Sequence, residues 1–245
     1  MGTLYWVGGA GTWDTGASTH WSDTSGGPGV MPSPTQIDNV VFDANSGSGA
    51  VTCSGLPICA YMNTTGYTGS LSGALIARSD VILGSAAGTY TGLDLEMTAD
   101  AGPVGLTSAG KTIGSLTLSA STGKPAVVSC TDALSVSGAV TLQTNGTDPC
   151  TLKLKHGVSS SVGSFVTTAP SSGTNTLCST SAGTRATLSD VSGTNTLSYV
   201  TAQDIAFTGG ATWAVGTGFV DGGNNIFGVD SGTAAATQLF FGSVA

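Results

Sequence analysis

Charged side chains are scarce in this sequence. Only 8% of its 245 residues are Asp, Glu, Lys or Arg, and 6 basic residues face 14 acidic ones, which gives a net charge of −8. Such a chain repels phosphate backbones and gains nothing from counterion release, so we expect no nucleic-acid partner. Catalytic sites need clustered titratable groups, and their scarcity argues against an enzyme.

Long apolar runs and a basic N-terminal start are also missing. No stretch approaches the roughly 20 apolar residues of a membrane-spanning helix. Residues 1–4 (MGTL) have neither the basic start nor the apolar run of a secretory signal, and Trp6 stands where a myristoylation signal needs Ser or Thr. We therefore expect a protein made in the cytoplasm, with no membrane partner.

Metal-ligand spacings are absent as well. The 5 cysteines are an odd number without paired short spacing, and the 2 histidines are isolated, so zinc is not favoured. The cysteines lie in strand-like segments, which predicts buried free thiols that pack as small apolar groups. A disulfide between Cys53 and Cys59 is the alternative to free thiols at these two positions.

Calcium is the one cofactor that the sequence leaves as an alternative to none. Oxygen-rich loops suit this hard cation, and the N-terminal loops hold Asp14, Asp23, Asp38 and Asp43. Aspartates in such loops also cap turns by accepting backbone hydrogen bonds, and we favour this interpretation. We therefore predict no cofactor and no metal.

Catalytic patterns are missing too. No G-x-S-x-G motif is present, and the basic residues are dispersed apart from residues 153–156 (KLKH). A polysaccharide-degrading β-helix would need two carboxylates converging beside a cleft, within about 10 Å of each other. The sequence does not indicate such a pair, so we predict a protein that is not an enzyme.

Glycine and short apolar patterns are what the sequence has in abundance. It contains 38 glycines and is 40% hydrophobic, and the strand-like segments around Leu93–Leu95, Leu116–Leu118 and Val140–Leu142 recur at intervals of about 24 residues. That interval is typical of stacked solenoid repeats. We predict an all-β fold, a single-stranded right-handed β-solenoid with an aromatic N-terminal cap; a β-sandwich or jelly roll is the alternative.

The composition divides the chain into four parts. Residues 1–45 contain three of the four tryptophans and form a predicted cap or attachment module. Residues 46–189 are the solenoid body, with roughly six coils of three short strands each. Residues 190–232 are closing coils, and residues 233–245 are an apolar tail.

Motifs near both ends carry a family resemblance. The N-terminal motifs are YWVGGAGTWD at residues 5–14, HWS at 20–22, SGGP at 25–28 and VVFDAN at 40–45. The C-terminal motifs are GTRATLS at 183–189, YVTAQD at 199–204, GGATW at 209–213 and VDGGNN at 220–225. Together they resemble a group of phage and environmental-bacterial β-helix proteins. The chain departs from that group at His20, where Asn is usual, and at Ile226–Phe227, where Gly-Trp is usual.

The resemblance implies a structural or binding role. We expect a bacteriophage virion structural protein on the virion surface, a homotrimer that decorates the capsid and binds the major capsid protein or other virion proteins. A receptor-binding tail fibre or tailspike-like protein, or a bacterial adhesin, each with glycan as partner, is the alternative, and a polysaccharide-degrading enzyme comes last. The candidate docking residues are aromatic or apolar: Trp6, Trp13, Trp21, Leu239, Phe240 and Phe241.

Overall fold

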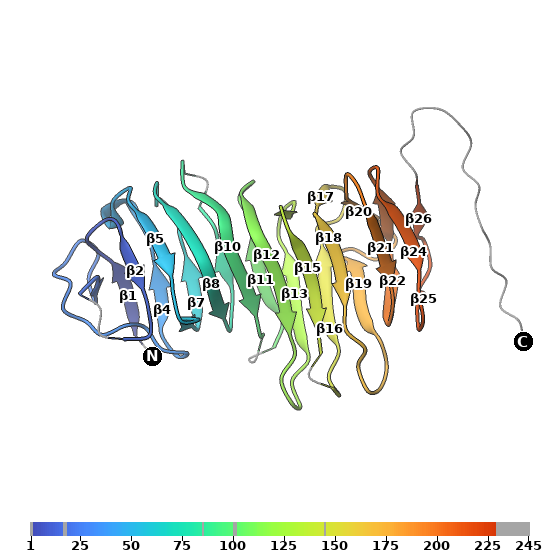
Figure 1. Ribbon diagram of the computed structural model, residues 1–245, viewed down its shortest axis with the longest axis horizontal. Helices are drawn as coiled ribbons and strands as arrows, with labels where there is room; N and C mark the ends of the chain where they lie inside the picture. Colours follow the sequence, from blue (N-terminus) through green and yellow to red (C-terminus); the bar gives the residue numbers. More distant parts are fainter. Residues whose placement is uncertain (1, 17–18, 85, 100–101, 145, 229–245) are drawn as a thin grey trace, which may run out of the picture.

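The chain folds into a β-solenoid of about 8 turns whose strands stack in parallel (Figure 1). The computed structural model describes residues 2–16, 19–84, 86–99, 102–144 and 146–228. Within these residues the helical content is a single 3-10 turn, Ala44–Ser46, and no helix is long and apolar enough to cross a membrane. The predicted all-β solenoid is therefore confirmed, and the sandwich and jelly-roll alternatives are wrong.

One sheet runs along the whole solenoid. Its parallel strands are, in stacking order, β1 (Thr3–Trp6), β4 (Asn39–Val41), β7 (Tyr61–Asn63), β9 (Val81–Ile82), β11 (Val104–Thr107), β13 (Ala126–Cys130), β16 (Cys150–Leu154), β19 (Asn175–Ser179), β22 (Val200–Gln203) and β25 (Val220–Asp221). The short strand β3 (Trp21–Ser22) pairs antiparallel with β1 and ends the sheet at the N-terminal side. We call this sheet the first sheet.

A second sheet stacks beside it. Its path is β2 (Gly11–Trp13), β5 (Ala50–Cys53), β8 (Ser70–Ala77), β10 (Thr89–Met97), β12 (Thr112–Ser119), β14 (Ser135–Val136), β17 (Ser159–Ser161), β20 (Ala186–Ser189), β23 (Ile205–Thr208) and β26 (Ile226–Phe227). Off this path, β6 (Ile58–Cys59) pairs with β8, and β15 (Ala139–Gln143) pairs with β12 and β18 (Ser164–Thr167). A third, small sheet joins β21 (Thr194–Leu197) to β24 (Thr212–Val215).

The strand register confirms the predicted repeat. Leu118 lies directly beside Leu142, and Leu116 lies between Leu95 and Val140. In the body, a coil consists of three short strands, such as β16, β17 and β18. The first-sheet strands of residues 46–189 are β7, β9, β11, β13, β16 and β19, which matches the expected number of coils.

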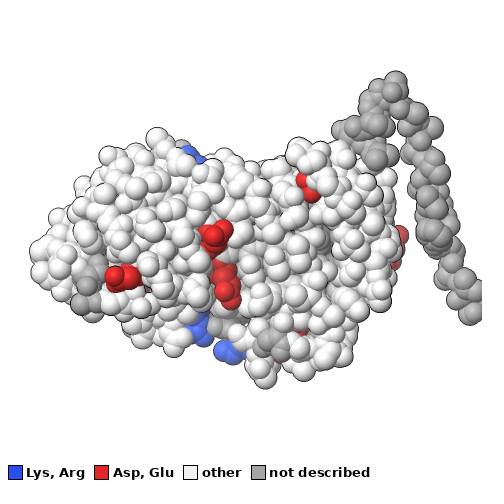
Figure 2. Space-filling model, viewed as in Figure 1, with Lys and Arg blue, Asp and Glu red and all other residues white. Residues whose placement is uncertain are grey.

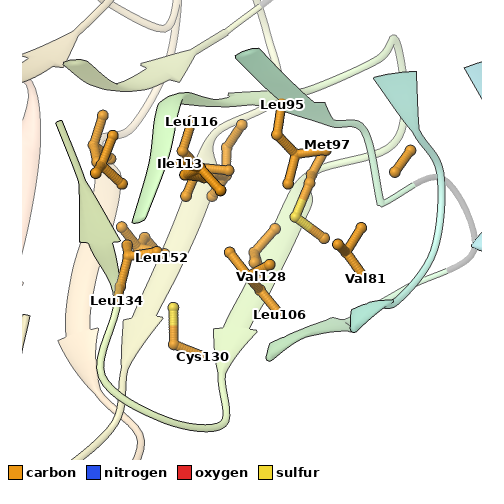
Figure 3. Packing of buried hydrophobic residues seen from close by; sticks show 14 of the residues in the cluster. Val81, Leu95, Met97, Leu106, Ile113, Leu116, Val128, Cys130, Leu134 and Leu152 are labelled. Carbon is orange, nitrogen blue, oxygen red and sulfur yellow. The ribbon is translucent and has the colours of Figure 1, made fainter. Parts of the chain in front are cut away.

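The core is a set of stacked apolar columns. Val104, Val128, Leu152 and Leu177 are successive partners in the first sheet, and all are buried. Figure 3 shows Val128 and Leu152 with their neighbours between the strands. Because parallel strands lie about 4.8 Å apart, each inward side chain contacts its equivalent in the next coil. Stacking a 24-residue repeat thus buries one continuous core.

The cysteines belong mainly to this core. All five are free, so the Cys53–Cys59 disulfide is not formed. Cys53, Cys59, Cys130 and Cys150 are buried, whereas Cys178 is half-buried at an outward-facing position of β19. Burial raises the pKa of the Cys53 and Cys130 thiols to about 12. These thiols pack as small apolar groups, as the sequence predicts.

Candidate functional site

The N-terminal end of the solenoid is closed by aromatic rings. Trp6, Trp13 and Trp21 come from β1, β2 and β3, and all three are 0% exposed. The Trp21 ring meets the Trp6 and Trp13 rings edge to face at centroid distances of 5.1 Å and 5.2 Å. Phe42 packs against all three rings and also contacts the ring of Tyr67 in the next coil.

The predicted docking role of these tryptophans needs correction. Side chains that are fully buried in the folded chain present no surface to a partner, so docking through their rings is wrong for this conformation. Their burial has a cost, because Nε1 of Trp13 and of Trp21 is buried without a hydrogen-bond partner, while Nε1 of Trp6 donates to the Gly9 carbonyl at 2.8 Å. The cap therefore seals the core.

The glycines of the N-terminal motif fit around His20. Its ring stacks on Trp6 at 4.8 Å and 15°, and Nδ1 lies 3.2 Å from the Val7 carbonyl oxygen. A Cβ on Gly8 or Gly11 would lie 2.9 Å from the His20 ring, and Gly8 has φ of +97°. A larger residue at either position would push the ring off Trp6. The motif is thus explained by packing.

The four N-terminal aspartates each hold a separate loop contact. Asp14 accepts from the Gly16 amide, Asp23 from the Thr24 hydroxyl, Asp38 from the Gly2 amide and Asp43 from the Asn45 amide, each at 2.9 Å. Over the described residues, no group of three or more His, Cys, Asp or Glu lies together in a way that could hold a metal. The geometry therefore matches local turn and loop contacts.

Aspartates in the loops of the body and of the closing coils connect neighbouring coils. Each accepts a hydrogen bond from a backbone amide of an adjacent coil: Asp80 from Gly105 (2.7 Å), Asp132 from Ser108 (2.8 Å), Asp148 from Gly123 (2.7 Å) and Asp204 from Gly183 (3.0 Å). Bonds from an amide to a carboxylate are stronger than neutral ones. Several of the scarce charges therefore serve to hold the loops of the solenoid together.

Two other carboxylates share a shallow hollow on the second sheet. Asp94 and Glu96 lie two residues apart on β10, so strand geometry puts both side chains on one face, with their Cα atoms about 7 Å apart. The hollow has a volume of about 110 Å³ and is lined by Leu56, Ala74, Leu75, Asp94, Leu95, Glu96, Ser115 and Thr117. Figure 2 shows a few acidic groups, two of them close together, on a face that is otherwise mostly uncharged.

This hollow meets only part of what a polysaccharide-degrading site needs. Two carboxylates lie on one strand face, as such a site requires, and Asp94 accepts a hydrogen bond from the Ser115 hydroxyl at 2.7 Å. A general acid, however, needs a desolvating pocket, whereas Asp94 is exposed and Glu96 only half-buried. The arrangement suits hydrogen bonding to a polar ligand better than proton transfer.

The C-terminal end of the described chain differs sharply from the N-terminal end. The outermost described strands are β24, β25 and β26, and they carry Val215, Val220, Ile226 and Phe227 with 59%, 47%, 45% and 41% of their surface exposed. Trp213 and Phe219 pack partly buried beside them. We call these six residues the end face.

Ring contacts tie the end face to the core. Phe207, fully buried, lies 5.0 Å from Trp213 and 4.9 Å from Phe227, with the Phe227 ring stacked at 16°. In the sequence, Trp213 belongs to the motif GGATW and Ile226–Phe227 stands where the resembled group has Gly-Trp, so this face was not predicted. The aromatic content of residues 213–227 is the signal that could have indicated it. The candidates Leu239, Phe240 and Phe241 lie outside the described residues.

Comparison with family models, curated proteins and solved structures gives no match for this chain.

Proposed function

We propose that this protein is a bacteriophage virion structural protein that decorates the capsid surface and acts without catalysis. Its attachment surface is the C-terminal end, and its partner is the major capsid protein or another virion protein. The observation that carries the proposal is the difference between the two ends. One end is sealed by buried tryptophans, and the other presents exposed apolar side chains.

The body of the solenoid supports a structural role. Its neighbouring coils are joined by parallel strand ladders and by carboxylate-to-amide bonds, and the loops are short. Such a rod resists local unfolding because every inner coil is paired on both sides. A rigid rod holds its two ends apart, which suits a protein that stands on a shell.

A homotrimer fits this attachment. The end face consists of six side chains, which is small beside the 20–30 residues per partner of a standard interface. Three copies around a three-fold position of a shell would bind together, so that avidity multiplies a weak single contact. Trimer formation is part of the proposal.

The test is the number of copies per particle. Particles of the phage that encodes this chain are purified, and the chain is counted against the major capsid protein by quantitative mass spectrometry. Hundreds of copies support capsid decoration, and a few to tens indicate a tail appendage. Absence from the particles would overturn the proposal.

A deletion tests the attachment end. Removing residues 237–245 should abolish incorporation into particles while the circular dichroism spectrum and the thermal transition of the solenoid persist. The matched control replaces Val30, a residue of the N-terminal end that is 75% exposed, with Asp. If the deletion variant is incorporated as well as this control, attachment through the tail is wrong.

A glycan-binding tail fibre is the second candidate, and the hollow at Asp94 and Glu96 favours it. A carboxylate pair beside Ser115 offers acceptors and a donor to sugar hydroxyls. Glycan-array binding that is lost in Asp94→Asn with Glu96→Gln, but kept in Asp148→Asn, would support it. No binding by the unmodified protein would remove it, and release of reducing sugar ends would instead indicate the enzyme.

A further inference from the structure

The hollow on the second sheet combines two carboxylates with an apolar wall. Asp94 is exposed, Glu96 is half-buried, and Leu56, which lines the same hollow, has 54% of its surface exposed. None of the described residues that line the hollow is basic. Two carboxylates beside an exposed leucine fit an ammonium group on an aliphatic stem, because the charged end gains acceptors and the stem covers the leucine. We call Leu56, Asp94 and Glu96 the acidic patch.

Two lysines project from the first sheet with the same spacing. Lys153 lies on β16, and Lys155 follows directly after that strand. The lysines alternate with the buried Leu152 and Leu154, so both lysine side chains face outward, with their Cα atoms about 7 Å apart. This is the step that also separates Asp94 from Glu96 on β10. We call Lys153 and Lys155 the basic patch.

The two patches of one copy cannot reach each other. They lie on different sheets, and the first-sheet strands β9, β11, β13 and β16 show that the basic patch is three coils beyond the acidic patch, about 14 Å along the rod. A second copy of the chain supplies the complementary charges. Each copy has a net charge of −8, so two copies repel each other unless opposite charges meet in their contact.

We propose that Asp94 and Glu96 of one copy bind Lys153 and Lys155 of the next copy in the trimer. This inference rests on the homotrimer of the proposed function, and the contact leaves the end face free for attachment. Because the patches lie on different sheets, the contact is head to tail, and a three-fold rotation closes it.

The position of the patches also fixes how the rods stand. The offset of three coils means that each rod tilts against the three-fold axis, while the long lysine side chains span part of the distance. Exposed ion pairs add little affinity individually. Their complementarity sets the orientation of neighbouring copies, whereas the end face holds the copies to the shell.

Carbodiimide cross-linking of the full-length protein tests this contact. The reagent joins a carboxylate to an amine only where the two groups touch. An equal mixture of isotope-labelled and unlabelled chains should therefore give mixed-isotope peptides that link Asp94 or Glu96 to Lys153 or Lys155. A band at three times the chain mass should appear on a denaturing gel.

Charge reversal tests the same contact without a reagent. Asp94→Lys with Glu96→Lys should weaken trimer formation by about tenfold or more, measured by light scattering over a range of concentrations, because like charges then face each other. Adding Lys153→Glu with Lys155→Glu to the same chain should restore trimer formation to within about threefold of the unmodified chain. Circular dichroism checks that each variant is folded.

The matched control is Asp14→Lys with Asp23→Lys. It changes the net charge by the same amount in the N-terminal loops, outside both patches. This control should form trimers at least as well as the unmodified chain, because its contact is intact and its net charge is less negative.

Three results would overturn the inference. A chain that stays monomeric, a trimer whose mixed-isotope links join other residues, or a combined variant as weak as the acidic-patch reversal would each mean that the patches do not meet. Counting copies in particles is independent of these results. Absence from particles refutes the proposed function even where the cross-link forms, and hundreds of copies without the cross-link refute only the contact.

Discussion

Replacing Asn195 with alanine should lower the free energy of unfolding by about 3 kcal/mol. Asn195 lies on β21, is 2% exposed, and joins strands that no backbone ladder connects. Its Oδ1 accepts from the Phe165 amide of β18 at 2.7 Å, and its Nδ2 donates to Asp190 Oδ2 at 2.8 Å. Asp190 is also buried, at 2% exposed.

The magnitude follows from what the truncation leaves behind. A buried amide without an acceptor costs about 1–3 kcal/mol, and loss of a bond to a charged group costs about 1.5–3 kcal/mol. Both hydrogen bonds belong to the same side chain, so their two free-energy costs are not fully additive. A loss of this size is a large fraction of the roughly 5–15 kcal/mol that stabilises an ordinary domain.

Urea unfolding followed by circular dichroism measures the effect. The matched control is Thr196→Ala, on the same strand but exposed, which should change the free energy of unfolding by less than about 0.5 kcal/mol. Where Asn195→Ala fails to fold, Asp190→Asn provides a milder version, because an amide oxygen can still accept from Asn195. If Asn195→Ala and Thr196→Ala lower the free energy of unfolding by the same amount, the two hydrogen bonds of Asn195 do not stabilise the last described coils.

Three further outcomes are expected. At pH 8, alkylation followed by mass spectrometry should label Cys178 and spare the other thiols until urea unfolds the chain; labelling of Cys130 in the folded chain would contradict its burial. Because the pKa values of Cys53 and Cys130 are about 12 in the folded chain and 9.0 for an unperturbed thiol, the unfolded chain loses these protons first. Their contribution to stability is therefore present below pH 9 and declines from pH 9 to pH 12, so the melting temperature should fall over this range; a constant value would refute this. Trp13→Ala should cost about 3–5 kcal/mol by emptying the cap, and Val30→Ala should cost almost nothing in the same urea titration.

The repeat could be predicted from the sequence because it is a local necessity of the fold. Leu118 and Leu142 must each fill the same column one coil apart, and this requirement appears directly as spacing. The glycines of the N-terminal motif can be read from the sequence as well. Their structural role could not be predicted, because Gly8 and Gly11 leave space for the imidazole ring of His20, which lies 9 or more residues later in the chain.

The candidate site was predicted less well, for physical reasons. An aromatic cluster in a sequence fits a cap or a docking surface equally, and only the antiparallel return of β3 decides that Trp21 covers Trp6 and Trp13. The exposure of Val215 follows from its place in the outermost coil that the structure describes, and no local sequence pattern indicates that place. Asparagine is typical of turns, so the sequence alone suggests a turn at Asn195. Its hydrogen bond to the Phe165 amide joins residues 30 positions apart, and no local pattern indicates it.

The proposed decoration of a phage capsid is tested most directly by a cryo-electron microscopy map of purified phage particles. Rods are expected on the outer shell, grouped in threes, with β24, β25 and β26 against the capsid protein and the tryptophan cap pointing outward. Rods attached by the tryptophan cap, or a shell without them, would contradict it.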